Sequence, residues 1–447
     1  MSKCRFLLLP ALGVLCLICN ACIPPYSARK IEVNPIHPEK GLTLFLYMAA
    51  DNELEPYAIQ DLVALEQSVA FFDDDVSILA LLDRPAGARL YHLRPLSSPA
   101  NGTIQSPPID SSFLGLSDAA PMPVNMGEPW TLKQFIRHGV NSFPAQNYAM
   151  VIWGHGSGWR SQPTDKQADY VVRTKGVNRA LAYDDGSSDA LYTSQLADGL
   201  SELQELTAQK WGLIGFEICH GMMLEVLYEL RNITDYAAGS VDIVAAAGWD
   251  WMSIGSDLPT ADVTDSLTLG ELLCQAFAAA YPTTNNAAFS VVKLDKIQAI
   301  NDCWNKFSQA VLDGISADEL RRQARDILFL QTEDHFEIPG DLNIDLADAA
   351  AKIAVLLPSV GQASSAVNTL VQDAVVSNFT SINGNPESHG IAVHLVPLNE
   401  HGAAMLPHDL AYIKGSNADY PLEFVEDSDW VLSVDGSGLL HRIWYGE

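Results

Sequence analysis

The sequence contains little positive charge. Its 447 residues include 26 Lys and Arg against 55 Asp and Glu, which gives a formal net charge of −29 at pH 7. The acidic residues are spread along the chain and form no acidic tail. Such an excess of negative charge repels phosphate backbones and anionic lipid headgroups. We therefore expect no nucleic-acid binding and no attachment to a membrane through a basic patch.

Cysteine is also scarce. Four of the seven cysteines lie within the first 22 residues, so the rest of the chain has Cys219, Cys274 and Cys303. An odd and sparse set excludes a disulfide scaffold. Cys274 lies in an apolar helical pattern and is explained as a core residue. The free thiol of Cys219, beside a polar turn, requires another explanation.

Several catalytic motifs are missing. The chain has no G-x-S-x-G, no H-E-x-x-H and no phosphate-binding P-loop, and no paired C-x-x-C. These absences remove the usual support for a serine hydrolase of the nucleophile-elbow type, a zinc metallopeptidase, a nucleotide hydrolase or a cysteine-ligated zinc site.

The N-terminus has the features of a targeting signal. Lys3 and Arg5 precede an apolar run that is too short to span a bilayer, which predicts a secretory signal over residues 1–21. Cys22 follows a loose bacterial lipobox that lacks the usual leucine, so we expect lipidation there, with plain secretion as the alternative. The Pro-containing residues 22–40 would be a tether. The protein is thus expected to be exported and to meet the membrane only through a lipid anchor.

The rest of the chain alternates between strand and helix patterns. Continuous apolar runs indicate strands covered on both faces at 42–47, 76–83, 148–153 and 211–218, with helical patterns near 55–67, 131–143, 194–207 and 222–231. This alternation predicts a mostly parallel sheet flanked by helices in an α/β domain over 41–300. Residues 301–447 are expected to be mainly helical (297–313, 317–330, 343–357, 362–377) and to complete the fold, with one strand at 390–396 returning to a sheet.

Two reactive side chains follow neighbouring strands. His155, flanked by glycine in "VIWGHGSGW", comes after the third apolar run, and Cys219 comes after the fourth. Parallel strands end at one edge of a sheet, so the two residues are expected there together. A histidine can activate a thiol nucleophile, and a helix starting near Gly221 would favour the thiolate. The alternative is a buried structural cysteine beside a strand-end histidine.

Several segments, in order, resemble the clostripain family of cysteine peptidases, which belongs with the caspases, gingipains and separase. They are "LYMAADNELE", "VIWGHGSGW", "IGFEICHGMMLEVLYEL", "YAAGSVDIVAAAGWDW", "GIAVHLVP" and "LEFVEDSDWVL", and they extend over roughly 41–435. The resemblance implies a caspase-like α/β fold and a His–Cys dyad that cleaves peptides or proteins, usually after Arg or Lys.

The resemblance also implies roles for single residues. His155 and Cys219 match the catalytic pair. Glu217 stands where the family generally has the Asp at the base of the pocket for the basic side chain. A Glu can still pair with a cation, but its extra methylene leaves Arg versus Lys preference open. Asp242 is either a further pocket residue or a solvated surface carboxylate.

Two more features belong to the family-like segments. Backbone N–H groups near Gly156 and at Cys219 are the candidates for stabilising an oxyanion, although Gly156 is explained equally well as a turn former. Asp51 and Asn52, in the first segment, either cap the following helix through an Asx turn or take part in the site.

Maturation and calcium binding are further implications of the resemblance. Some relatives are cut between the histidine and the cysteine, and here 160–192 carries Arg and Lys, with 171–179 as the first choice and an uncut loop as the alternative. Some relatives require calcium. Asp73–Asp75 and Asp184–Asp185 offer carboxylates without the spacing of an EF-hand loop. Calcium is therefore a candidate cofactor, and no other cofactor and no metal ligand is assigned.

Two functions remain open at this level. The first is an exported cysteine endopeptidase, favoured by the retention of His155 and Cys219. The second is a catalytically silent relative that acts as a surface binding module, favoured by the departures at Glu217 and His220.

Overall fold

The computed structural model describes residues 40–68, 75–94, 102–116, 122–159, 181–330, 342–384, 386–396, 412–415, 422–433, 435 and 437–445. All of them belong to one compact unit that covers residues 38–447. The predictions for the signal, for Cys22, for the tether before residue 40, for Asp73 and Asp74, and for cleavage within 171–179 lie outside the described residues.

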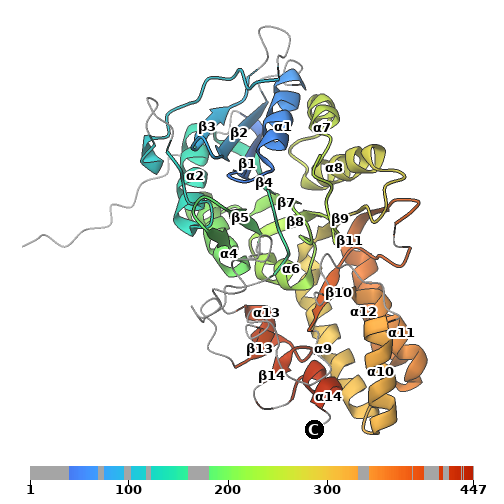
Figure 1. The fold of residues 1–447 in the computed structure, drawn as a ribbon. Helices are drawn as coiled ribbons and strands as arrows, with labels where there is room; N and C mark the ends of the chain where they lie inside the picture. The colour runs from blue at the N-terminus through green and yellow to red at the C-terminus, as the bar shows by residue number, and fades with distance from the viewer. Residues whose placement is uncertain are drawn as a thin grey trace, which may run out of the picture. The chain divides into compact units, whose positions relative to one another are not determined.

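An eight-stranded sheet forms the centre of the fold (Figure 1). Its strands are β1 (Lys40–Ala49), β2 (Val76–Asp83), β3 (Arg89–His92), β4 (Ala145–Trp153), β7 (Trp211–Glu217), β8 (Thr234–Gly239), β9 (Ala288–Lys293) and β11 (Val375–Thr380). The spatial order is β11-β9-β8-β7-β4-β1-β2-β3. The five strands from β8 to β2 are parallel, whereas β3, β9 and β11 each run antiparallel to the strand they join. The predicted mostly parallel sheet is confirmed.

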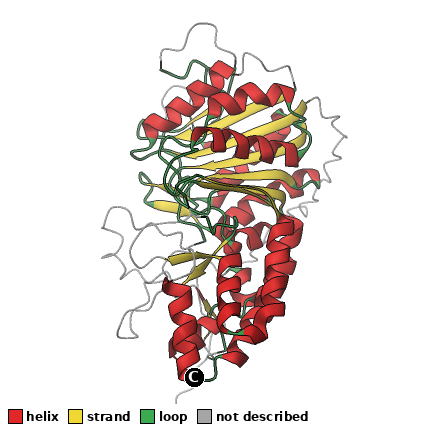
Figure 2. Cartoon of the chain, turned by 90° about the vertical axis from the view of Figure 1, so that its right-hand side faces the viewer, coloured by secondary structure: helices red, strands yellow, loops and turns green. Residues whose placement is uncertain are grey.

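Helices cover both faces of this sheet (Figure 2). One face carries α1 (Glu55–Ser68), α7 (Trp251–Asp257) and α8 (Ser266–Ala280), and the other carries α2 (Pro129–Ser142), α4 (Thr193–Leu200), α5 (Glu202–Thr207) and α6 (Leu224–Leu230). The alternation of side chains along β1 explains the two layers. Phe45 and Tyr47 enter one core, and Leu44 and Leu46 enter the other. Apolar residues are therefore needed on both sides of the strand, as the run Leu44–Ala49 shows.

The C-terminal part is mainly helical, as predicted. It contains α9 (Ile297–Gly314), α10 (Asp318–Leu330), α11 (Leu346–Leu356), α12 (Gly361–Ala374), α13 (Glu423–Asp427) and α14 (Leu439–Tyr445). Helix α9 contacts α12 and α14, and α11 contacts α12. Their apolar side chains join the same core as α6. Among the described residues, no helix combines the length and apolarity that crossing a membrane requires.

Three two-stranded sheets and four 3₁₀ turns complete the described structure. The sheets are β5 (Ala182–Asp184) with β6 (Asp189–Leu191), β10 (Leu342–Asp345) with β12 (Ala392–Leu395), and β13 (Ile413–Lys414) with β14 (Leu432–Ser433). The 3₁₀ turns are Ser112–Leu114, Leu258–Thr260, Leu294–Lys296 and Pro358–Val360.

The strand predicted at 390–396 is confirmed, and the sheet that it joins is a small two-stranded one. It forms β12, which pairs antiparallel with β10. The edge of the large sheet is occupied instead by β11, whose first residues the sequence pattern assigns to the end of a helix. The helix predicted over 362–377 is wrong at its end, because α12 stops at Ala374 and residues 375–380 pair with β9 as a strand.

Candidate active site

The strand register brings His155 and Cys219 to one edge of the sheet. Strands β4 and β7 pair in parallel, with Trp153 opposite Glu217. His155 and Cys219 each lie two residues beyond this pair. The expectation that both residues follow neighbouring strand ends is therefore confirmed for the backbone.

Two glycines allow the loops after these strands to touch. A Cβ built on Gly156 would lie 2.7 Å from the Cβ of Ile218, and one on Gly158 would lie 2.9 Å from the carbonyl oxygen of His220. Gly158 also has a φ of +79°, which favours glycine. The loop that carries His155 thus packs directly against the loop that carries Cys219, and Gly156 does more than form a turn.

His155 is partly exposed and contacts a carboxylate. Its Nε2 atom lies 3.2 Å from Oε1 of Glu53, and the two side chains are 43% and 75% exposed. At this exposure the pair contributes little to stability, on the order of 0–1 kcal/mol. It can still orient the imidazole. Glu53 was not identified from the sequence, although it lies within the first family-like segment.

Cys219 is half-buried, and its sulfur faces the backbone of Val244. The N–H of Val244 donates to Sγ at 3.4 Å, and the thiol can donate to the carbonyl of Val244 at 4.0 Å. A hydrogen bond donated to sulfur favours the thiolate over the thiol. This contact links Cys219 to the segment 240–250, which follows β8.

The helix after Cys219 starts later than the sequence suggests. Helix α6 begins at Leu224, so the prediction of a helix from about Gly221 is wrong. The N–H of His220 donates to the carbonyl of Asp242, and the N–H of Met222 donates to the carbonyl of Ser240. These bonds hold the chain after Cys219 against the neighbouring segment. Cys219 therefore does not lie in the first helical turn, and the helix N-terminus does not stabilise its thiolate.

His220 is buried within this turn. It adopts a left-handed backbone with φ of +57°, and its Nδ1 lies 3.0 Å from the carbonyl oxygen of Val241. A carbonyl only accepts hydrogen bonds, so Nδ1 carries the proton. The ring therefore ties the turn that carries Cys219 to the segment after β8.

Glu217 is buried and held by two tryptophans. Its Oε1 accepts from the backbone N–H of Trp249 at 2.6 Å, and its Oε2 accepts from the indole N–H of Trp251 at 2.9 Å. Burial, and then the nearby carboxylate of Asp61, raise the pKa of Glu217 well above its ordinary value. The two hydrogen bonds oppose this rise, since they stabilise the charged form.

Asp242 is also buried, with only 2% of its surface exposed. Its Oδ1 accepts from the N–H of Ile243 at 2.9 Å. The interpretation of Asp242 as a solvated surface carboxylate is therefore wrong. Its substrate-binding role stays a prediction, because its contacts lie within the turn that supports Cys219.

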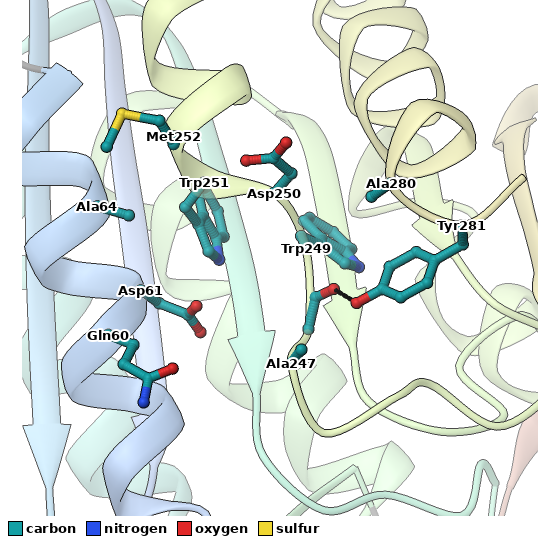
Figure 3. A pocket seen from close by; sticks show the side chains of 11 residues that line it. Gln60, Asp61, Ala64, Ala247, Trp249, Asp250, Trp251, Met252, Ala280 and Tyr281 are labelled. Carbon is teal, nitrogen blue, oxygen red and sulfur yellow. Dashed lines mark hydrogen bonds between the residues drawn. The ribbon is translucent and has the colours of Figure 1, made fainter. Parts of the chain in front are cut away.

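A cavity of about 300 Å³ is lined by Trp249 and Trp251, the two residues that bond to Glu217 (Figure 3). It is lined by α1, by the segment 247–252 and by the end of α8. In Figure 3 the carboxylate of Asp61 and the rings of Trp249 and Trp251 face this space. The hydroxyl of Tyr281 donates to the carbonyl of Gly248 at 2.6 Å and fixes the segment that forms its wall. The wall segment is continuous in sequence with Val244, whose N–H donates to Sγ of Cys219.

Asp61 and Asp250 are the acidic residues that line this cavity, and neither was identified from the sequence. Asp61 lies on α1, and its Oδ2 accepts from the indole N–H of Trp153 at 2.9 Å. Burial raises the pKa of Asp61 to about 7, and the bond from Trp153 offsets part of that rise. A single Asp within a helical pattern does not indicate such a position, because Asp61 reaches Trp153 only when α1 packs on the sheet.

Three further carboxylates meet behind the His155 loop. Single oxygens of Asp51, Asp83 and Asp184 lie within 4.8 Å of one another. The Oδ1 of the neighbouring Asn52 accepts a hydrogen bond from the N–H of Leu54 at 2.9 Å, which confirms the Asx-turn interpretation for Asn52. Oxygen-only groups of this kind suit a hard divalent cation.

The fold and the paired strand ends define a caspase-like α/β domain of the cysteine-peptidase type. The family described as Peptidase C11, the clostripain family, matches residues 46–431. The chain therefore belongs to the clostripain family, which is a family of cysteine peptidases. Clostripain of Hathewaya histolytica is 26% identical over 258 residues, which are 51% of this chain and 45% of clostripain. The match thus spans less than half of that relative's length.

Solved structures show the same fold. A secreted C11 cysteine protease from Bacteroides thetaiotaomicron, in complex with an irreversible peptide inhibitor, has a TM-score of 0.60 at 19% identity, covering 88% of this chain and 99% of that one. An inactive zymogen C11 protease from Parabacteroides distasonis has a TM-score of 0.57 at 19% identity, covering 80% and 93%. At these identities the similarity supports the fold, in agreement with the caspase-like prediction.

Proposed function

We propose that this chain is an exported cysteine endopeptidase that uses Cys219 as nucleophile and His155 as general acid and base. The observation that carries the proposal is the β4–β7 register, together with the packing of Gly156 on Ile218. Membership of the clostripain family supports the same chemistry. Export is supported by the basic and apolar start of the sequence, and the secreted structural neighbour agrees with it.

The reaction follows from the two side chains. His155 takes the thiol proton as the sulfur of Cys219 bonds to the peptide carbonyl carbon. The C–N bond then breaks, and the imidazolium gives its proton to the leaving amine. Water attacks the thioester with the help of His155, which frees the acid and regenerates the thiol. Because Nε2 of His155 faces Glu53, Nδ1 is the nitrogen that we assign to the thiol.

The charge that develops on the carbonyl oxygen needs nearby donors. Backbone N–H groups at Cys219 and around Gly156 lie on the two loops that meet at the edge of the sheet. We assign them to the oxyanion hole, where fixed donors stabilise the tetrahedral intermediate. Glu53 is a positioning residue in this scheme, since it holds the ring of His155 and does not contact the substrate.

The acidic cavity supports cleavage after Arg or Lys. A guanidinium or ammonium entering it would meet the carboxylate of Asp61 and the faces of Trp249 and Trp251. Glu217 is held by the same tryptophans, since both of its oxygens accept hydrogen bonds from them. We therefore assign Asp61 the direct contact with the cation, whose positive charge favours the ionised carboxylate, and Glu217 the support of the two tryptophans.

Fluorogenic peptides ending in Arg or Lys test the activity. The wild type should cleave them, and Cys219→Ala should lose at least about a thousandfold in kcat, the scale on which removal of a nucleophile acts. Cys303→Ala removes another free cysteine and serves as the matched control. Equal rates in wild type and Cys219→Ala, with calcium present, would support the silent binding module instead.

The preference for substrates with Arg or Lys is tested separately. Asp61→Asn and Glu217→Gln keep the shape of each side chain and remove its charge. Both should raise KM for Arg and Lys peptides, with the larger effect at Asp61. An unchanged preference in both variants would remove this cavity from the substrate site.

Processing is the remaining part of the proposal. We propose removal of residues 1–21, lipidation of Cys22 and cleavage within 160–192. Mass spectrometry of protein purified from a bacterial host should find a chain that starts at a lipid-modified Cys22 and is broken in that connection. An unmodified N-terminus, or a single intact chain in active preparations, would contradict the corresponding step.

A further inference from the structure

The loop that carries His155 ends at a tryptophan that is fully buried. Trp159 comes four residues after His155, and its carbonyl oxygen accepts from the hydroxyl of Thr193 at 3.0 Å. His155 itself is 43% exposed, and the carboxylate of Glu53 that it contacts is more exposed still. Buried packing fixes a side chain more firmly than an exposed ion pair does. Trp159 is therefore the anchor of this end of the loop.

Two rings from the C-terminal part pack against Trp159. Its ring centroid lies 5.1 Å from that of His394, in β12, and 4.8 Å from that of Tyr412. The rings of His394 and Tyr412 are themselves 5.1 Å apart. Among the described residues, the indole N–H of Trp159 has no hydrogen-bond partner, so packing positions the side chain. The place of Trp159 thus depends on where these two rings lie.

One carboxylate holds both of these neighbours. Glu225 lies in the first turn of α6 and is fully buried. Its Oε1 accepts from the phenol of Tyr412 at 2.6 Å and from the backbone N–H of His394 at 2.8 Å. Burial, and then the charge of Glu225, raise the pKa of Tyr412, so the phenol keeps its proton and donates. Two donors that share one buried acceptor are fixed relative to each other.

The same start of α6 supports the turn that carries Cys219. The N–H of Ala392, in β12, donates to the carbonyl of Met222 at 3.1 Å. Gly158 leaves no room for a Cβ beside the sulfur of Met223, so the His155 loop packs on this turn as well. Both catalytic loops therefore rest on the residues that Glu225 ties together.

We propose that Glu225 and Tyr412 are positioning residues for the catalytic pair. The carboxylate holds the phenol, the phenol packs on Trp159, and Trp159 fixes the loop that aims His155 at Cys219. This inference rests on the proposed function, because it requires His155 to act on the thiol. Neither positioning residue contacts the substrate. The C-terminal part of the chain thereby helps to set the geometry of the site.

Steady-state kinetics with Arg and Lys peptides give the first test. Tyr412→Phe keeps the ring against Trp159 and removes the bond to Glu225. We expect kcat to fall about tenfold or more with KM within about twofold, because a shift of roughly 1 Å in a catalytic group can cost about a hundredfold in rate. Tyr228→Phe is the matched control, since it removes from the same helix a hydroxyl that donates to Asp427 at 2.8 Å. Its kcat should equal that of the wild type.

Glu225 has its own pair of variants. Glu225→Leu removes the acceptor and should lower kcat as Tyr412→Phe does. Glu225→Gln keeps an amide oxygen that can accept from both donors, so it should recover most of the rate. Equal kcat in the two variants would contradict the role of this oxygen.

Alkylation of Cys219 by iodoacetamide, followed by peptide mapping from pH 5 to pH 9, gives a readout that needs no substrate. A thiol paired with an imidazolium reacts well below the ordinary thiol pKa of about 8.5. The wild type and Tyr228→Phe should react at low pH, whereas the midpoint in Tyr412→Phe should rise toward the ordinary value. If Tyr412→Phe fails to fold, Trp159→Phe loosens the same stack of rings and should give the same shift.

Two results would overturn the proposal. The first is a kcat and an alkylation profile in Tyr412→Phe that match the wild type. The second is an equal loss in Tyr228→Phe, which would show that any weakening of the C-terminal contacts has this effect. A wild type that cleaves no peptide and whose Cys219 titrates as an ordinary thiol would instead reject the proposed function itself.

Discussion

Asp61→Asn should change how the stability of the protein depends on pH. The substitution keeps an oxygen that can accept from the indole of Trp153, and it removes the proton that Asp61 gains or loses. Burial raises the pKa of this carboxyl from 3.8 to about 7. Asn therefore resembles the protonated form, which the folded protein prefers.

The sign and size of the change in unfolding free energy follow from proton linkage. Below pH 4, Asp61 is protonated in both the folded and the unfolded chain. Between pH 4 and about 7 the unfolded chain loses the proton and the folded chain keeps it, so the free energy of unfolding falls as pH rises. A difference of about 3 pKa units amounts to about 4 kcal/mol when the window has been crossed. Asp61→Asn should thus stabilise the protein by about 1 kcal/mol at pH 4.5 and by about 4 kcal/mol at pH 8.

Urea denaturation followed by tryptophan fluorescence measures this difference. Curves for wild type and Asp61→Asn at pH 4.5, 6 and 8 give the change in unfolding free energy at each pH. Asp257→Asn, an exposed residue on α7, is the control and should show no growth with pH. If the unfolding free energies of wild type and Asp61→Asn differ by the same amount at all three pH values, the pKa of Asp61 is not raised in the folded protein.

Other substitutions test the packing around the site. Gly156→Ala places a methyl group against Ile218, so we expect a loss of about 1–3 kcal/mol in unfolding free energy together with slower turnover of peptide substrates. Tyr281→Phe removes the bond to the carbonyl of Gly248, which should cost about 0.5–1.5 kcal/mol and raise KM for basic peptides. Glu225→Leu leaves a buried hydroxyl and a buried N–H without their acceptor, so thermal unfolding should show a loss of about 1–3 kcal/mol or more, whereas Glu225→Gln should lose less.

Much of the sheet could be predicted from the sequence. The run at 76–83 matches β2, and the other three apolar runs lie within one to four residues of β1, β4 and β7. These strands are covered on both faces, so their sequences are mostly apolar on both sides. The short strands β8, β9 and β11 were missed because small or polar residues interrupt them, and their pairing depends on distant partners.

The site was predictable only in part. His155 and Cys219 were identified because each follows an apolar strand and the family pattern matches both. Asp61 and Asp83 could not be found, since one lies within a helix and the other ends a strand. Their roles arise when α1 packs on the sheet and when three strand or turn ends converge. The spacing of residues along the sequence does not show which distant residues come together in the fold.

Covalent labelling shows most directly whether Cys219 is the nucleophile and His155 its base. A peptidyl acyloxymethyl ketone with Lys or Arg at its reactive end, followed by peptide mapping, reports which thiol meets the substrate. We expect modification of Cys219 alone, at a rate that falls strongly in His155→Ala. Modification of Cys303 or Cys274 instead, or an unchanged rate in His155→Ala, would contradict a nucleophile and a base that work together at this edge of the sheet.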